Sequence, residues 1–214
     1  IPTTVTASPD GGQVVLVGGG DPTLDRDGLA SLADDTARTL RDRGVDEAEL
    51  RYDDTLYSGP ELHPISPNEN ISPVTPLMIE EGRLDGSRNG TAPRSTDPAG
   101  DAARAFAEML RERGIKGKGD PAPGKGPGNA EPVARVLSAP LSALVERTLT
   151  HSDNDIAEAL ARQTALASGE PAGFEGAGKA VASRLKELDL PLSGARFADG
   201  SGLDRDDRMS AALL

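Results

Sequence analysis

The sequence predicts an α+β fold, in which a small unit containing strands precedes a group of closely spaced helices. β-Branched runs on either side of one helical stripe give the first fifty or so residues a strand–helix–strand outline. From Val133 onward, apolar residues recur at helical spacing in successive stretches. Aromatic residues make up only 2% of the 214, so the core must consist mainly of Leu, Val and Ala, which suits an Ala-rich helical layer.

The first elements are short strands around one helix. Gln13–Val17 is a β-branched run closed by three glycines, and the Thr-rich segment before it also has the composition of a strand. Apolar positions over residues 29–40 recur at helical spacing, and Gly44 supplies a C-terminal stop. Leu50–Asp53 is predicted to be the next strand.

Connections dominate the middle of the chain. Residues 58–76 contain five prolines, which remove backbone donors and forbid a continuous ladder or helix, so an ordered loop or a domain seam is expected there. Asp101–Arg113 has one apolar helical face and is followed by a glycine. The Gly-, Pro- and Lys-rich run 117–128 is the strongest candidate for a linker or flexible hairpin.

The last third of the chain is predicted to be helical. We place a domain boundary near residue 133, so that 1–132 and 133–214 form separate parts. Pro140 occupies a first helical position, where its missing N–H is harmless. The helical stripes cover residues 140–149, 156–167 and 174–188.

Composition excludes several classes of function. The net charge of −12 argues against a nucleic-acid partner, because such binding needs clustered Lys and Arg. The absence of Cys excludes disulfides, thiolate metal sites and a Cys nucleophile. The chain has no apolar run near 20 residues, so no transmembrane segment is expected in it. It starts without Met and stops inside an apolar turn, and we expect an internal piece of a longer protein.

Ser152-Asp153-Asn154 lies between two helical stripes and has two interpretations. Ser and Asp commonly cap helices by accepting hydrogen bonds from unpaired backbone N–H groups. Alternatively, Ser152 relays a proton while Asn154 holds a substrate amide, because a hydroxyl and an amide can both donate and accept. The tripeptide alone does not decide between them.

The context of this tripeptide resembles a known family. The surrounding motifs are S-A-P-L at 138–141, D-I-A-E-A-L at 155–160, and D-G-S-G-L at 199–203 with Arg205 behind it. Together they resemble penicillin-binding proteins of the D-alanyl-D-alanine carboxypeptidase type, in the class with domains inserted between the first and second active-site motifs. V-G-G-G-D-P-T-L at 17–24 and D-D-T-L-Y-S-G-P at 53–60 resemble parts of that insertion. The bias toward Ala, Arg, Asp and Gly suggests an actinobacterial source.

The resemblance implies a transpeptidase-like domain, with a five-stranded antiparallel sheet and helices on both faces, to which residues from about 133 contribute mainly helices. Residues 1–132 would form inserted small α/β and β-rich domains. In this superfamily the active-site motifs are S-x-x-K, then S-D-N or S-x-N, then K-T-G. Only the middle motif is credible here, and the nucleophilic Ser and its Lys are expected before Ile1.

The resemblance also implies roles for individual residues. Ser152 would be the proton relay toward the leaving amine, and Asn154 the hydrogen-bond partner of the substrate and the catalytic Lys. Asp153, Ser201 and Gly202 are candidate substrate-binding residues. Neither a cofactor nor a metal is expected.

The function implied is serine-type carboxypeptidase activity, with possible endopeptidase activity, on peptidoglycan peptides ending in D-Ala-D-Ala. An acyl-enzyme forms and water releases it. β-Lactams would acylate the same Ser, and the protein would act outside the cytoplasm, in the cell envelope or secreted. The alternative is a non-catalytic envelope-binding module, which would lack S-x-x-K and K-T-G in the whole protein.

Three further patterns have simpler explanations. Ser183–Lys186 matches S-x-x-K, but it follows S-D-N and lies on a helix with its Lys at the flank. Gly173–Ala180 has the spacing of a phosphate-binding loop, but it lacks a preceding strand and a hydroxyl after the Lys, and is better explained as a helix start. His63 and His151 have no metal-ligand partners at helical spacing, although His151 adjoins Ser152 and could line a cleft.

Overall fold

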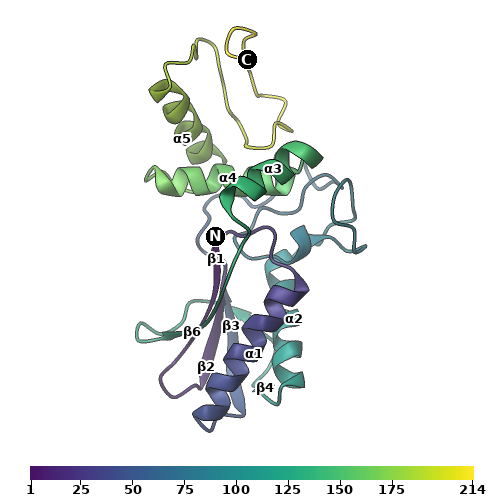
Figure 1. Ribbon diagram of the computed structural model, residues 1–214, viewed down its shortest axis with the longest axis vertical. Helices are drawn as coiled ribbons and strands as arrows, with labels where there is room; N and C mark the ends of the chain where they lie inside the picture. Colours follow the sequence, from purple (N-terminus) through teal and green to yellow (C-terminus); the bar gives the residue numbers. More distant parts are fainter.

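The computed structural model describes residues 1–214, which form two parts of different secondary structure (Figure 1). The first part is a sheet with two helices, and the second consists of three helices followed by an irregular tail. The α+β class predicted from the sequence is therefore confirmed.

All the strands belong to one mixed sheet, in the order β4-β3-β2-β1-β6, with β5 also paired to β3. β1 is antiparallel to both β2 and β6, whereas β2 and β3 are parallel. The parallel pair requires a crossover, and the helix α1 between the two strands supplies it. The strands are β1 (Pro2–Ala7), β2 (Gln13–Val17), β3 (Glu47–Asp53), β4 (Lys116–Gly117), β5 (Ala122–Pro123) and β6 (Glu131–Leu137).

Two helices, α1 (Arg26–Asp42) and α2 (Pro98–Glu112), pack side by side against the sheet (Figure 1). Each begins at an aspartate, Asp25 or Asp97, whose carboxylate accepts a hydrogen bond from the backbone N–H three residues later. Their apolar faces join the inward side chains of the strands in a core of 19 buried residues. The predicted helical stripe over residues 29–40 thus faces this core.

The connections differ from expectation in two places. The Gly- and Pro-rich run 117–128 is not a free linker, because β4 at its start and β5 in its middle pair with β3. Residues 54–97 contain one short 3-10 helix, η1 (Glu80–Gly82), and isolated bridges. The β-rich unit expected among the inserted residues is thus not seen as a second sheet, in keeping with prolines that cannot donate to a ladder.

The second part contains α3 (Leu141–His151), α4 (Asn154–Ala167) and α5 (Phe174–Glu187). The boundary expected near residue 133 lies inside β6, which pairs with β1 as far as Leu137. The change from sheet to helices falls at 138–140. The division of the protein into domains stays a prediction.

The stripe predicted for α3 has the right spacing but an unexpected environment. Only Leu144 is buried, whereas Leu141, Val145 and Leu149 are exposed, Leu149 by 79%. Among the helices described, none has both the length and the hydropathy needed to cross a bilayer.

Candidate active site

The S-D-N tripeptide forms the turn between α3 and α4, as the sequence predicts. α3 ends at His151, Ser152 follows in the left-handed region at φ 54° and ψ 50°, and α4 starts at Asn154. The Ser152 side chain is exposed. A hydroxyl at a sharp turn between two helices is accessible to a ligand, and the proton-relay role expected for Ser152 stays a prediction.

The neighbours of Ser152 point in different directions. Asp153 is buried and caps α4, with its Oδ1 accepting from the Ile156 N–H at 3.1 Å. The helix-cap interpretation therefore holds for Asp153, and its expected substrate-binding role stays a prediction. Asn154 is half-buried, and its Nδ2 donates to the Asn70 carbonyl at 3.2 Å.

Beneath the turn lies a buried group of charges that the sequence interpretation missed. We call it the arginine–carboxylate cluster, and it contains Glu81, Arg83, Arg94, Arg147, Asp153 and Asp155. Half of its members come from the irregular segment 54–97 and half from α3, α4 and the turn between them. The cluster therefore joins the two parts of the chain directly below Ser152.

Each carboxylate of this cluster faces a guanidinium. Arg94 Nη1 lies 2.8 Å from Asp155 Oδ2 in a buried ion pair. Glu81 accepts from Arg83 Nε at 2.8 Å and from Arg147 Nη2. Three carboxylates and three guanidiniums balance formally, so the acidic side chains are already neutralised without a metal ion.

Burial shifts the acid–base equilibria of this cluster. Burial, followed by the charge of Asp153, raises the pKa of Glu81 to about 7, against the opposing hydrogen bond from Arg83. Burial also raises the pKa of Asp155 to about 6, although Arg94 lowers it. Both groups therefore titrate within a few pH units of neutrality.

The D-G-S-G-L segment forms a loop that wraps around two carboxylates. The Ser201 Oγ donates to Asp199 Oδ2 at 2.8 Å, and the Ser201 backbone N–H donates to Glu158 Oε1 at 3.0 Å. Gly202 has a φ of 78°, a conformation that favours glycine. Ser201 and Gly202 also line a cavity of about 470 Å³ between α4, α5 and this loop. Their expected substrate-binding role stays a prediction.

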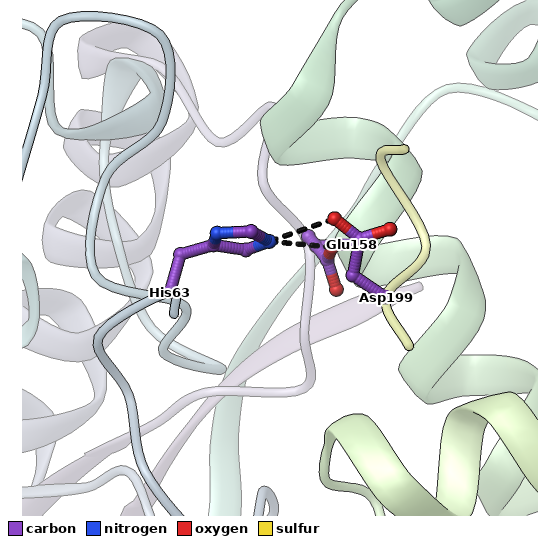
Figure 2. A group of neighbouring side chains, drawn as sticks. All are labelled: His63, Glu158 and Asp199. Atoms are coloured by element: carbon purple, nitrogen blue, oxygen red, sulfur yellow. Dashed lines mark hydrogen bonds and ion pairs between the residues drawn. The ribbon is translucent and has the colours of Figure 1, made fainter. Parts of the chain in front are cut away.

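His63 approaches the same loop from the proline-rich segment (Figure 2). Its Nε2 lies 2.8 Å from Asp199 Oδ2 and 3.8 Å from Glu158 Oε1. We call these three buried side chains the histidine–carboxylate cluster. Sequence spacing gave no sign of it, because His63 and Asp199 are 136 positions apart.

Hydrogen bonding indicates the tautomer of His63 in the histidine–carboxylate cluster. The ligand atoms of the three side chains lie within 4.8 Å of one another, a spacing that a metal ion could bridge. The Ile65 N–H, however, donates to His63 Nδ1 at 3.3 Å, which assigns the ring proton to Nε2. In this tautomer the Nε2–H donates to Asp199 Oδ2 in a buried hydrogen bond, and the expectation that no metal binds here stays a prediction.

Asp199 accepts more hydrogen bonds from the protein than Glu158 does. Its oxygens accept from His63 Nε2, Ser201 Oγ and the backbone N–H groups of Gly202, Leu203 and Asp204. Burial raises the pKa of Asp199, but these hydrogen bonds outweigh burial and hold the pKa well below its usual range. Burial and the charge of Asp199 raise the pKa of Glu158.

The patterns set aside at the sequence level have simple structures. Ser183 and Lys186 are exposed on α5. The phosphate-loop-like segment forms the start of α5, where Lys179 pairs with Glu175 one turn earlier at 2.6 Å. His151 is exposed at the last position of α3.

Comparison with known proteins defines the class first. The model of the D-Ala-D-Ala carboxypeptidase 3 (S13) family matches residues 2–89 and 85–214. The structure resembles penicillin binding protein 4 (dacB) from Haemophilus influenzae with a TM-score of 0.78 at 20% identity, over 96% of this chain and 61% of that one. The same protein complexed with a β-lactam gives a TM-score of 0.64 at 20% identity, covering 96% and 59%.

The family match covers nearly the whole chain, which therefore belongs to the D-Ala-D-Ala carboxypeptidase 3 (S13) family. Carboxypeptidase DacB of Mycolicibacterium smegmatis is 35% identical over 217 residues, which are 95% of this chain and 46% of that protein. The chain spans about half the length of the curated relatives it matches. The mycobacterial relative agrees with the actinobacterial source that the composition suggests.

Proposed function

We propose that the whole protein containing this chain is a serine-type D-Ala-D-Ala carboxypeptidase of peptidoglycan. The observation that carries this proposal is the exposed S-D-N turn in a chain of the S13 family. The substrate is a stem peptide ending in D-Ala-D-Ala, which also places the protein outside the cytoplasm. β-Lactams inhibit it, as the β-lactam complex of the Haemophilus protein suggests.

The chemistry is acyl transfer in two steps. A Ser from outside these 214 residues attacks the carbonyl carbon of the penultimate D-Ala, and its proton passes to a neighbouring base. The new C–O bond forms as the C–N bond breaks, and the leaving D-Ala nitrogen takes up a proton through Ser152. Water then attacks the acyl-enzyme, which releases the shortened peptide and restores the Ser.

Ser152 and Asn154 have separate tasks in this scheme. The Ser152 hydroxyl is exposed and can both accept and donate the proton that reaches the leaving amine. The Asn154 amide lies one helical position into α4 and forms hydrogen bonds with the substrate backbone and the catalytic Lys. In the structure its Nδ2 rests on Asn70, a contact that a substrate carbonyl would replace.

The test compares two exposed serines in the full-length protein. Ser152→Ala should slow labelling by a fluorescent penicillin and the release of D-Ala by roughly 10²–10⁴-fold, the usual effect of removing a positioned proton-transfer group. Ser183→Ala is the matched control and should label at the wild-type rate, because Ser183 is exposed on α5 and its S-x-x-K match follows S-D-N instead of preceding it. Equal labelling rates for the two variants would refute the role of Ser152.

The chain of 214 residues alone should form no covalent penicillin adduct, because it lacks a K-T-G motif and its S-x-x-K match lies on an outer helix. In the D-Ala release assay of the full-length protein, a stem peptide ending in D-Ala-L-Ala serves as the substrate control and should not be cleaved. Adduct formation by the short chain would contradict an external nucleophile.

A further inference from the structure

The four residues of the turn alternate between outward and inward side chains. Ser152 is exposed and Asn154 half-buried, whereas Asp153 and Asp155 are buried. The two residues proposed to meet the substrate are therefore interleaved with two carboxylates that reach into the protein. Whatever holds these carboxylates also holds the outward residues.

The backbone of Ser152 needs such support. A residue with a side chain is disfavoured at φ 54°, and surrounding contacts must impose that conformation. The Asp153 N–H donates back to the Thr148 carbonyl at 3.2 Å, which closes the end of α3. This bond fixes one side of the turn, and the inward carboxylates fix the other.

Each inward carboxylate has its own anchor. Asp153 Oδ2 lies 3.4 Å from Arg147 Nη2. Asp155 faces Arg94 at 2.8 Å, and its Oδ1 accepts from the Ser72 N–H at 2.9 Å. Arg147 comes from the preceding helix, whereas the partners of Asp155 come from the irregular segment.

Glu81 connects the two anchors. Its carboxylate accepts from Arg147, and its main-chain carbonyl accepts from Arg94 Nη1 at 2.6 Å. Glu81 itself has a φ of 56°, a second strained backbone in the same cluster. Arg147 Nη2 also donates to the Arg88 carbonyl at 3.0 Å, so this guanidinium touches both parts of the chain.

We propose that Arg147, Arg94 and Glu81 are positioning residues, which set the orientation of Ser152 and Asn154 for acyl transfer. This inference rests on the proposed function. The three residues touch no substrate and act through Asp153, Asp155 and the backbone of the turn. Because proton transfer to the leaving nitrogen depends on placement of the donor to a fraction of an ångström, a turn released from its anchors loses rate rather than affinity.

The experiment removes one anchor in the full-length protein. In Arg147→Met, single-turnover acylation by a fluorescent penicillin should show a first-order acylation constant reduced roughly 10- to 100-fold, the effect of a small misplacement. The constant for the preceding reversible binding should stay within about 3-fold. Arg147 is 34% exposed, so its loss leaves little buried volume empty. Arg147→Lys restores a cation at this position and should recover most of the rate.

A matched arginine separates positioning from stability. Arg113 is 22% exposed and pairs with Asp34 at 2.6 Å on the other part of the chain. Arg113→Met should lower the melting temperature by a similar amount but leave the acylation constant unchanged. If Arg147→Met folds poorly, Asp155→Asn keeps the side-chain shape, removes the charge opposite Arg94, and should slow acylation in the same way.

The outcomes distinguish this inference from the proposed function. A smaller labelled fraction that reacts at the wild-type rate, or no change at all, would overturn the positioning role of Arg147. Slow acylation by Ser152→Ala alongside such a result would leave the proposed function standing. A wild-type rate for Ser152→Ala would remove the proposed function, and the positioning role with it.

Discussion

The arginine–carboxylate and histidine–carboxylate clusters join the same irregular segment, 54–97, to the helices after residue 140, and they neutralise buried acids differently. The first surrounds its carboxylates with guanidiniums on several elements. The second surrounds Asp199 mainly with backbone N–H groups of one loop, and adds the imidazole of His63. The arginine–carboxylate cluster depends on paired charges, and the histidine–carboxylate cluster depends on the backbone conformation of the loop around Asp199.

This difference determines how substitutions in each cluster should lower the stability of the protein. A buried ion pair that loses one partner leaves an uncompensated charge, whereas the loss of both partners can be nearly neutral. A carboxylate held by backbone donors has no partner side chain that could be removed with it. Paired substitutions should therefore rescue the first cluster and not the second.

The largest expected effect is that of Asp199→Ala, which leaves five donors without their acceptor. Buried donors without partners each cost about 1–3 kcal/mol, and those at the loop edge regain water, so we expect a loss of about 4 kcal/mol in the free energy of unfolding. Urea unfolding of the full-length protein measures it. Asp206→Ala, at an exposed residue paired with Arg196, should change stability by less than about 0.5 kcal/mol.

Arg94→Met should cost about 3 kcal/mol, because it leaves Asp155 buried without its cation; the two side chains are only 5% and 3% exposed. The double variant Arg94→Met with Asp155→Leu should recover about half of this loss. Unfolding free energies of the two single variants and the double variant test the pairing. Additive losses would contradict a coupled pair.

The pH dependence of stability should differ between the clusters. The pKa of Glu81 is raised to about 7, so the folded state binds its proton more tightly than the unfolded chain, whose pKa is 4.5. Its contribution is thus greatest below pH 4.5 and falls, by roughly 3 kcal/mol, as the pH rises to about 7. The lowered pKa of Asp199 has the opposite sign: its contribution is complete above the ordinary pKa of 3.8 and is lost at lower pH.

Unfolding free energies measured from pH 3 to pH 8 test these signs. Glu81→Gln should reduce the slope between pH 4.5 and pH 7, leaving the part below about pH 6 that Asp155 supplies, and should not change the acid limb below pH 4. An unreduced slope between pH 6 and pH 7 would assign it to a group other than Glu81.

Local pattern was enough to predict β1, β2, β3 and the helices, but not β6, which occupies residues 131–137 where helices were expected to begin. Gln13–Val17 is the strand β2 as expected, because β-branched residues closed by glycines have few alternatives. The cap at Asp153 was also foreseeable, since a carboxylate before a helix accepts its free N–H groups. The exposed face of α3 was not, because spacing identifies an apolar stripe but not what covers it.

Neither cluster could be predicted from the sequence, and the reason is physical. Their contacts join the irregular segment to helices that follow much later, such as Glu81 to Arg147, and no periodicity links those positions. The sequence marked Ser152 and Asn154 through a short motif, but the side chains that hold them carry no motif. His63 has no partner at helical spacing in the sequence, but the fold brings it into contact with Asp199.

The smallest expected effect is that of His63→Phe, and it separates the two kinds of neutralisation. The ring packs edge-on against Phe174 at 5.4 Å, an arrangement that phenylalanine preserves, while its Nε2–H donor is lost. Asp199 keeps its other donors, so we expect a loss of about 1.5 kcal/mol, the contribution of a single hydrogen bond to a charged group. The acid limb of the stability profile should move to higher pH, because one of the hydrogen bonds that lower the pKa of Asp199 is gone. A loss as large as that of Asp199→Ala would mean that the imidazole, and not the loop backbone, neutralises this carboxylate. In that case the two clusters would depend on side-chain partners alike.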